Sequence, residues 1–189
     1  MEINLYDFDK TIYDGDSSVD FFVFCLSKHS LIGFNIFKMI WAVLKYKLKL
    51  INKTQMKEVI FSFLKKVPNV DEEVELFWQT HKCYIKDFYQ KKKHDNDIII
   101  SASPEFLLEP ICKELKVKKL IGSRVNKKTG KFTGLNCHDI EKVKRLNKEY
   151  DKYIVNESYS DSMSDLPILK LAKKAYIVKG DKLLLTDVK

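Results

Sequence analysis

The chain has 189 residues and a formal net charge of +8, from 34 Lys and Arg against 26 Asp and Glu. A hydrophobic content of 45% excludes a disordered chain, and the length fits one domain or one domain with an inserted subdomain. The lysines are spread along the whole chain, which is typical of a solvated surface, so we expect no nucleic-acid partner.

The four cysteines lie far apart and form no CxxC pair, which argues against a zinc or redox motif. They are typical of reduced, packed residues in a cytoplasmic protein. No run of eighteen uncharged apolar residues predicts a spanning helix. Because a polar motif follows within the first ten residues, we expect no signal peptide. No feature of the sequence indicates an oligomeric state.

The first predicted element is a short strand that contains Ile3 and Leu5 and runs into Asp7 and Asp9, with Thr11 two residues further on. Ligands bind at the carboxyl edge of open parallel sheets. Two carboxylates held there repel each other unless a cation offsets their charge, and Mg²⁺ prefers oxygen ligands. The motif therefore predicts an acidic, metal-assisted site. The alternative is a polar turn after a strand.

Residues 17–93 are predicted to be helical throughout. Asp16 or Ser17 is a candidate N-cap for a helical pattern from Val19 to about Leu64. A second block runs from about residue 71 to 93, and its first residues are acids, which the helix dipole favours.

The apolar stretch 31–50 carries lysines toward its end. We favour a helix packed inside a helical subdomain. The alternative is a surface that contacts lipid, with lysines reaching anionic headgroups, and it predicts a protein associated peripherally with a membrane.

From residue 97 onward strands and helices alternate. Strands are predicted at 97–101, 117–121, 153–155 and 175–178, a hairpin at 125–133, and helices at 105–115, 141–150 and 166–173. This alternation, with one strand at the start, predicts an α/β fold with a Rossmann-like, mostly parallel sheet. We therefore expect a catalytic core formed by residues 1–16 and 94–189, and an all-helical cap formed by residues 17–93.

Polar groups fall at or near the ends of these strands: Asp7, Asp9 and Thr11, then Ser101, Lys142, Asp161 and Asp165. Together they offer a carboxylate nucleophile, an acid–base group, metal ligands, a hydroxyl for phosphoryl oxygens and a cation to offset charge. This set is suited to phosphoryl transfer through an aspartyl-phosphate.

The order of these motifs resembles the haloacid dehalogenase superfamily, in its phosphoserine-phosphatase-like branch. The residues that carry the resemblance are Asp7-Phe8-Asp9-Lys10-Thr11, Ile98-Ile99-Ile100-Ser101 with its continuation through Glu105, Lys142, and Asp161 through Asp165. The hairpin Thr129 to Gly134 also matches. The cap is matched only by its position and helical character.

The resemblance implies a role for each residue. Asp7 is the nucleophile, and Asp9 protonates the leaving oxygen and then activates water. Mg²⁺ is held by the Asp7 carboxylate, the backbone carbonyl of Asp9 and Asp161. Phosphoryl oxygens are bound by Ser101 and the Ala102 N–H, with Thr11 as a further phosphate-binding candidate. Lys142 pairs with Asp7 and the phosphate, with Lys144 as the other candidate, and Asp165 either orients Lys142 or supports the metal.

Two positions depart from the family pattern: Ser160 and Lys10 stand where glycine is common. The implied activity is Mg²⁺-dependent hydrolysis of a phosphomonoester, either a small phosphorylated metabolite or a lipid phosphate. The cap contains no arginine to clamp an amino-acid carboxylate, since Arg124 and Arg145 lie outside it. The alternative function is a non-catalytic regulator that binds a phosphate ligand on the same fold.

Overall fold

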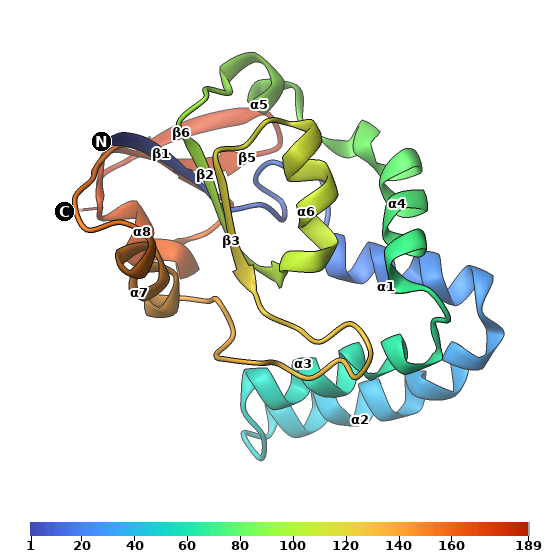
Figure 1. The fold of residues 1–189 in the computed structure, drawn as a ribbon. Coiled ribbons are helices and arrows are strands. Elements are labelled where there is room, and N and C mark those ends of the chain that lie inside the picture. The colour runs from blue at the N-terminus through green and yellow to red at the C-terminus, as the bar shows by residue number, and fades with distance from the viewer. Residues whose placement is uncertain (189) are drawn as a thin grey trace.

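The computed structural model describes residues 1–188 and has a six-stranded sheet in the order β3-β2-β1-β4-β5-β6 (Figure 1). The strands are β1 (Glu2–Tyr6), β2 (Asp97–Pro104), β3 (Lys119–Ser123), β4 (Ile154–Ser160), β5 (Ala172–Lys179) and β6 (Lys182–Thr186). All neighbouring pairs are parallel except β5 and β6. The expected mostly parallel α/β fold is confirmed, with β1 between β2 and β4.

Helices connect these strands and cover the sheet. They are α1 (Ser17–Lys28), α2 (Ile36–Lys47), α3 (Lys53–Phe61), α4 (Val70–His81), α5 (Asp87–Lys92), α6 (Glu105–Glu114), α7 (Ile140–Glu149) and α8 (Leu166–Leu169). Short 3-10 segments are η1 (Ser30–Asn35), η2 (Ser62–Lys66), η3 (Lys82–Tyr84) and η4 (Met163–Asp165). In Figure 1, α7 and α8 lie on one side of the sheet and α6 on the other.

Alternating residues of the central strands enter two separate apolar clusters, because successive side chains of a strand point to opposite faces. Ile3 and Leu5 pack with Leu146 of α7 and Ile168 of α8. Tyr6 packs on the other face, in a cluster that extends through α6 and α4 to Phe63 in η2. This second cluster includes residues of both the sheet and the helical insertion, so the two share a continuous core.

The helical insertion is segmented rather than one long helix. Asp16 is the N-cap of α1, since its carboxylate accepts from the backbone N–H groups of Ser18 and Val19, each at 3.1 Å. The helical pattern predicted from Val19 to about Leu64 is present as a series of helices, α1, η1, α2, α3 and η2. It is interrupted at His29, which has an extended backbone, and at Lys49, whose φ is 58°. The boundaries of the cap at residues 17 and 93 stay a prediction.

The expectation that the stretch 31–50 is packed inside the insertion is wrong. Ala42 is the buried residue of α2, and most other side chains of this stretch are half-buried or exposed. In Figure 1, α2 and α3 lie side by side at the bottom of the molecule, with α2 outermost. The reason is geometric: a helix at the edge of a two-helix layer is covered only on the face that meets its neighbour.

Further differences from the predicted elements concern an additional strand and the ends of individual elements. The last strand of the prediction is followed by β6, which pairs with β5 through a turn at Gly180. Strand β4 extends through Ser160, and the helix predicted at 166–173 ends at Leu169. The predicted hairpin at 125–133 is present in short form: Val125 and Phe132 form an antiparallel bridge, the Asn126 N–H donates to the Lys131 carbonyl at 2.8 Å, and the Thr133 N–H donates to the Arg124 carbonyl at 2.9 Å. No helix among residues 1–188 combines the length and apolarity needed to cross a bilayer.

Candidate active site

The predicted acidic residues meet at the carboxyl ends of β1 and β4, beside a cavity of about 490 Å³. One side of the cavity is the sheet edge, which contributes Asp7, Asp9, Asp161 and Asp165. The opposite side is formed by residues of α1, α2 and α3. The helical insertion therefore covers the edge of the sheet where parallel folds bind their ligands.

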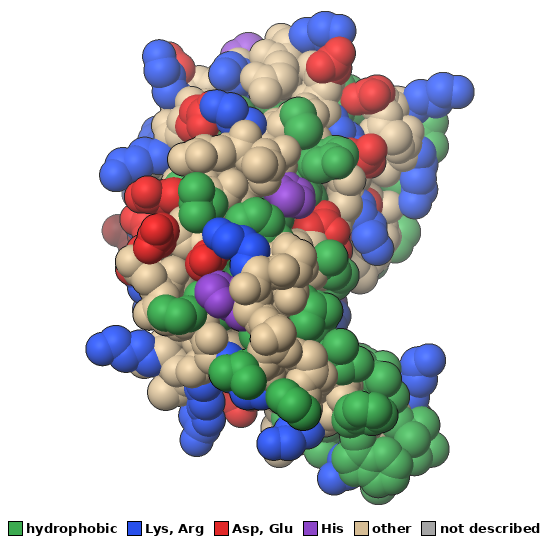
Figure 2. Space-filling view, turned by 90° about the vertical axis from the view of Figure 1, so that its right-hand side faces the viewer, with side chains coloured by type: hydrophobic (Ala, Val, Ile, Leu, Met, Phe, Trp, Pro, Cys, Tyr) green, Lys and Arg blue, Asp and Glu red, His purple; other side chains and the backbone are tan. Residues whose placement is uncertain are grey.

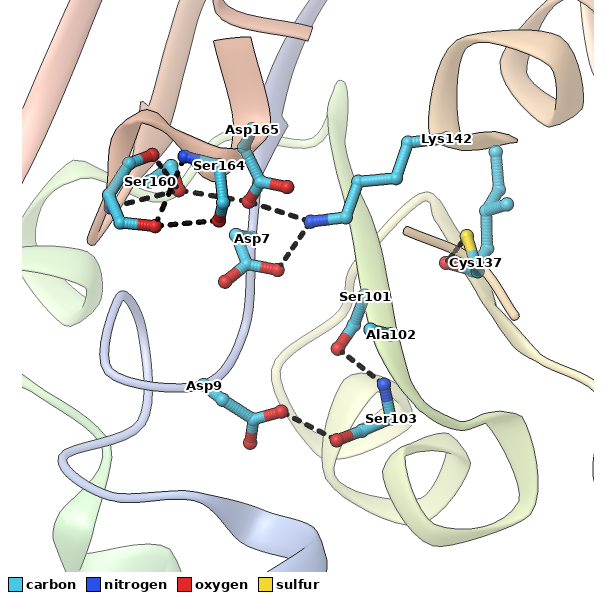
Figure 3. A network of polar contacts seen from close by, with 12 residues as sticks. Asp7, Asp9, Ser101, Ala102, Ser103, Cys137, Lys142, Ser160, Ser164 and Asp165 are labelled. Atoms are coloured by element: carbon cyan, nitrogen blue, oxygen red, sulfur yellow. Dashed lines mark hydrogen bonds and ion pairs between the residues drawn. The ribbon is translucent and has the colours of Figure 1, made fainter. Parts of the chain in front are cut away.

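Lys142 joins two carboxylates from different parts of the chain (Figure 3). Its Nζ donates to Asp7 Oδ1 at 2.7 Å and to Asp165 Oδ2 at 2.8 Å. All three side chains are buried, and Lys142 is only 1% exposed. The position of Lys142 in the first turn of α7 directs it to the sheet edge. The alternative candidate, Lys144, is exposed and lines a separate groove of about 780 Å³ along α6, β3 and α7.

The charges of this network are unbalanced, because two carboxylates share one ammonium. Burial, together with the Asp165 and Asp9 charges, raises the pKa of Asp7 to about 7, although Lys142 opposes the shift. Burial disfavours the ammonium of Lys142, but the carboxylates of Asp7 and Asp165 outweigh it and raise the pKa of Lys142. The lysine therefore stays charged at neutral pH. A second cation beside Asp7 would balance the network.

Asp9 lies apart from this network and is held by two other donors. The backbone N–H of Ser17 donates to Asp9 Oδ1 at 2.7 Å, and the Ser103 hydroxyl donates to Oδ2 at 2.5 Å. The Ser18 hydroxyl lies 2.9 Å from that of Ser103 and extends the chain of hydroxyl groups. Burial, with the nearby Asp16 charge, raises the pKa of Asp9. A carboxyl with a raised pKa can both give and take a proton near neutral pH.

The three phosphate-binding candidates have different surroundings. Ala102 lines the cavity. Ser101 is fully buried and its Oγ accepts from the Ser103 N–H at 3.1 Å. Thr11 is also fully buried, and its Oγ1 has no hydrogen-bond partner. Neither Ser101 nor Thr11 is among the residues that line the cavity. Their roles in phosphate binding stay predictions.

The oxygen groups near Asp7 fit a Mg²⁺ ion. Asp7 and Asp161 both line the cavity, and each oxygen of the Asp9 carboxylate accepts a hydrogen bond, so the backbone carbonyl of Asp9 stays the predicted third ligand. Within residues 1–188, no three His, Cys, Asp or Glu side chains are grouped as a metal site. Two carboxylates and a carbonyl suit Mg²⁺, which usually keeps several waters and is bound through one or two carboxylates and substrate phosphate.

Comparison with known proteins agrees with this geometry. The family model described as haloacid dehalogenase-like hydrolase matches residues 5–170. The chain belongs to the haloacid dehalogenase-like hydrolase family.

Individual relatives are distant. A histidinol-phosphatase of Neisseria meningitidis serogroup C (strain 8013) is 28% identical over 99 residues, which cover 46% of this chain and 45% of that protein. The matched segment thus spans less than half of that relative.

Two solved structures show the same fold. A protein of unknown function from Bordetella pertussis Tohama I has a TM-score of 0.78 at 17% identity, covering 93% of this chain and 89% of the other. A probable phosphoserine phosphatase from Vibrio cholerae has a TM-score of 0.69 at 15% identity, covering 92% and 55%.

The structure shows the local consequences of the two departures from the haloacid dehalogenase pattern, Lys10 and Ser160. Lys10 has a φ of 60°, in the left-handed region where glycine is favoured, which costs a lysine roughly 1 kcal/mol. The Ser160 hydroxyl donates to Asp165 Oδ2 at 2.9 Å, a contact that glycine cannot make. Ser160 therefore helps to hold the carboxylate that positions Lys142.

The sequence reasoning missed Lys57 of α3. Its Nζ donates to the Ala102 carbonyl at 2.8 Å and lies 3.3 Å from Asn136 Oδ1, so a cap lysine reaches the sheet edge. Burial, aided by the charge of Lys53, lowers the pKa of Lys57 to about 8. No local pattern distinguishes this lysine from the others, since its role depends on how α3 packs.

Ser103 was also missed, although the sequence contained a signal for it. In an extended strand, residues two apart point to the same face, so Ser101 and Ser103 of β2 share one orientation. Phe22 and His138 also line the cavity. Phe24 does not, because it packs against Phe77 in the insertion.

Proposed function

We propose that this member of the haloacid dehalogenase-like family is a phosphatase that hydrolyses phosphomonoesters through an aspartyl-phosphate on Asp7. The observation that carries the proposal is the buried Asp7–Lys142–Asp165 network, with Asp9 held separately at the same cavity. A carboxylate whose orientation is fixed by a buried ammonium is suited to act as a nucleophile.

The reaction proceeds in two displacements. An oxygen of Asp7 attacks phosphorus, the bond to the ester oxygen breaks, and the Asp9 carboxyl gives its proton to the departing alcohol. Asp9 then takes a proton from water, whose oxygen attacks phosphorus and releases phosphate and the Asp7 carboxylate. The raised pKa of Asp9 supports both proton transfers.

Other residues of the chain support these displacements. Lys142 offsets the negative charge near Asp7, and the Ser103 hydroxyl fixes the orientation of Asp9. We propose that Mg²⁺ is held by Asp7, Asp161 and the Asp9 carbonyl, where it would supply positive charge to the phosphoryl oxygens.

The lining of the cavity favours a phosphomonoester whose alcohol has an apolar part. Its polar end contains the catalytic carboxylates together with Lys53 and Lys57. The remainder of its lining is largely apolar, formed by Val19, Phe22, Met39, Met56, Ile60 and Phe61. We therefore propose a small phosphorylated metabolite or a lipid phosphate as substrate, with the apolar wall favouring an alcohol that contains hydrocarbon.

The test is turnover of an aryl phosphate with Mg²⁺, by the wild type and by Asp7→Asn. We expect the substitution to abolish turnover, and Asp14→Asn to retain it, because Asp14 is an exposed residue of the same loop. Borohydride reduction during turnover should convert Asp7 to homoserine, which mass spectrometry detects. Turnover that survives Asp7→Asn would refute the mechanism. Phosphate binding without turnover by the wild type would instead favour the non-catalytic regulator.

A further inference from the structure

Helix α2 exposes a stripe of large apolar side chains. Phe37 is 82% exposed, Trp41 57% and Ile40 62%, and all three lie on the solvent side of the helix. Their positions repeat at intervals of three and four residues, which places them on one face. Exposed neighbours before and after them continue the same face. The resulting set, here called the α2 stripe, consists of Phe34, Phe37, Ile40, Trp41, Leu44 and Leu48.

The α2 stripe forms part of a projecting end of the molecule. Figure 2 shows hydrophobic side chains gathered at the lower right, with lysine or arginine side chains at the edge of the group. Contiguous exposed apolar side chains of this kind mark an interaction surface rather than a solvated one. The opposite face of α2 meets α3, so the helix is apolar both toward its neighbour and toward solvent.

The charge around the α2 stripe is predominantly positive, although Glu58 of α3 lines a groove together with Trp41 and Lys45. Between Asp20 and Glu58 the sequence contains seven lysines and no acidic residue. Lys45 Nζ lies 5.7 Å from the ring centre of Trp41, and Lys66 Nζ lies 5.5 Å from that of Phe34. The lysines thus lie beside exposed aromatic rings, with their ammonium groups able to reach outward.

This combination fits an anionic lipid bilayer better than a second copy of the chain. In a two-fold symmetric dimer the same patch contacts itself, so lysines would face lysines. A bilayer instead offers hydrocarbon to the aromatic side chains and anionic headgroups to the lysines around them.

The α2 stripe is also connected to the active-site cavity. Met39 of α2 lines the cavity, beside Met56 and Ile60 of α3. Bilayer contact on the outer face of α2 would therefore lie about one helix diameter, roughly 10 Å, from the apolar wall of the cavity.

We infer that the α2 stripe docks the protein on an anionic lipid bilayer, and that the cavity takes a phosphomonoester lipid from that surface. The second half rests on the proposed phosphatase function, whereas the docking does not.

Docking is tested by sedimentation with vesicles of phosphatidylcholine, with and without phosphatidylglycerol. We expect the wild type to bind the mixed vesicles. The double variant Phe37→Ser/Trp41→Ser should bind at least ~10-fold more weakly because its apolar contact is lost. The triple variant Lys45→Gln/Lys47→Gln/Lys49→Gln should bind roughly 100-fold more weakly, about fivefold for each lysine.

The matched control is Leu185→Ser, because Leu185 is 68% exposed on β6, in a different part of the fold. It should bind vesicles as the wild type does. Docking is overturned if the wild type does not bind mixed vesicles, or if the apolar double variant binds them equally well. It is also overturned if analytical ultracentrifugation shows a dimer that the double variant dissociates without weakening vesicle binding.

The substrate half is tested with phosphatidic acid in the same vesicles and with a soluble aryl phosphate. We expect the double variant to lose at least ~10-fold of its turnover of phosphatidic acid and to keep that of the aryl phosphate, because the α2 stripe lies outside the cavity. Absence of aryl phosphate turnover in the wild type would refute the proposed function but leave docking to the sedimentation result. Aryl phosphate turnover without hydrolysis of phosphatidic acid would overturn the lipid substrate alone.

Discussion

Replacing Lys142 by Met should impair both stability and catalysis, and the loss of stability should depend on pH. The lysine is the shared donor to Asp7 and Asp165, at 2.7 and 2.8 Å, and all three side chains are buried. Met has a similar volume but no charge, so two buried carboxylates would face each other without compensation. Breaking a buried ion pair in this way costs about 3–5 kcal/mol.

The sign of the pH effect follows from the carboxylates. With Lys142 in place, the pKa of Asp7 is already raised to about 7. A carboxyl whose folded-state pKa exceeds its unfolded value destabilises the folded state as pH rises between those values. Without the ammonium, which lowers the pKa of Asp7, this penalty is larger at pH 8 than at pH 5, because the Asp7 carboxyl is already protonated at pH 5 with the lysine in place. Lys142 stays charged throughout this range because its pKa is raised.

The assay is thermal unfolding followed by circular dichroism in the presence of EDTA, at pH 5 and pH 8. For a chain of this length, 3–5 kcal/mol corresponds to a decrease in Tm of roughly 6–20 °C, expected at pH 8. The decrease at pH 5 should be clearly smaller. Aryl phosphate turnover should fall by about 10²–10³.

The control is Lys144→Met on the same helix, where an exposed lysine should change stability by no more than about 0.5 kcal/mol. Equal decreases in Tm at the two pH values would refute the electrostatic reasoning. So would a variant of Lys142 that keeps most of its activity.

Three further predictions concern the cap and its contacts. Lys57→Met should weaken inhibition by inorganic phosphate about tenfold. In the wild type this inhibition should weaken above pH 8, because Lys57, with a pKa of about 8, loses its charge there, and the variant should not show this pH dependence. Unchanged inhibition would exclude Lys57 from phosphate binding. Gly130→Ala should lower the free energy of unfolding by about 2 kcal/mol or more, because φ is 73° and the new Cβ would lie 2.2 Å from the Phe61 carbonyl oxygen. The control Gly33→Ala, whose new Cβ would have no atom within 4 Å, should change the free energy of unfolding by less than about 1 kcal/mol in urea titrations. Equal effects of the two glycine substitutions would contradict the prediction. Trp78→Phe should lower the free energy of unfolding in urea by about 1–3 kcal/mol with an unchanged m-value. The reason is that the indole N–H donates to a carbonyl of α6 at 2.6 Å. A smaller loss would show that water replaces this donor.

Local sequence patterns were sufficient to predict which edge of the sheet carries the acidic residues. Apolar strands that end in Asp7, Ser101 and Asp161 can be recognised locally, because a buried parallel strand has a continuous apolar pattern and a polar end. Chain topology then requires those ends to meet at one edge. The resemblance to the haloacid dehalogenase superfamily also implied that Lys142 pairs with Asp7, and the structure brings the two together at 2.7 Å.

Tertiary structure alone decided which cap residues reach the cavity and which remain exposed. Lys57 resembles every other helical lysine in the sequence until α3 packs over Ala102. The stretch 31–50 has the apolar pattern of a core helix, yet α2 packs mainly on α3 and the short η1 and leaves Phe37 and Trp41 in solvent. A hydrophobic pattern specifies that a face is apolar, but the number of neighbouring elements decides whether that face is covered.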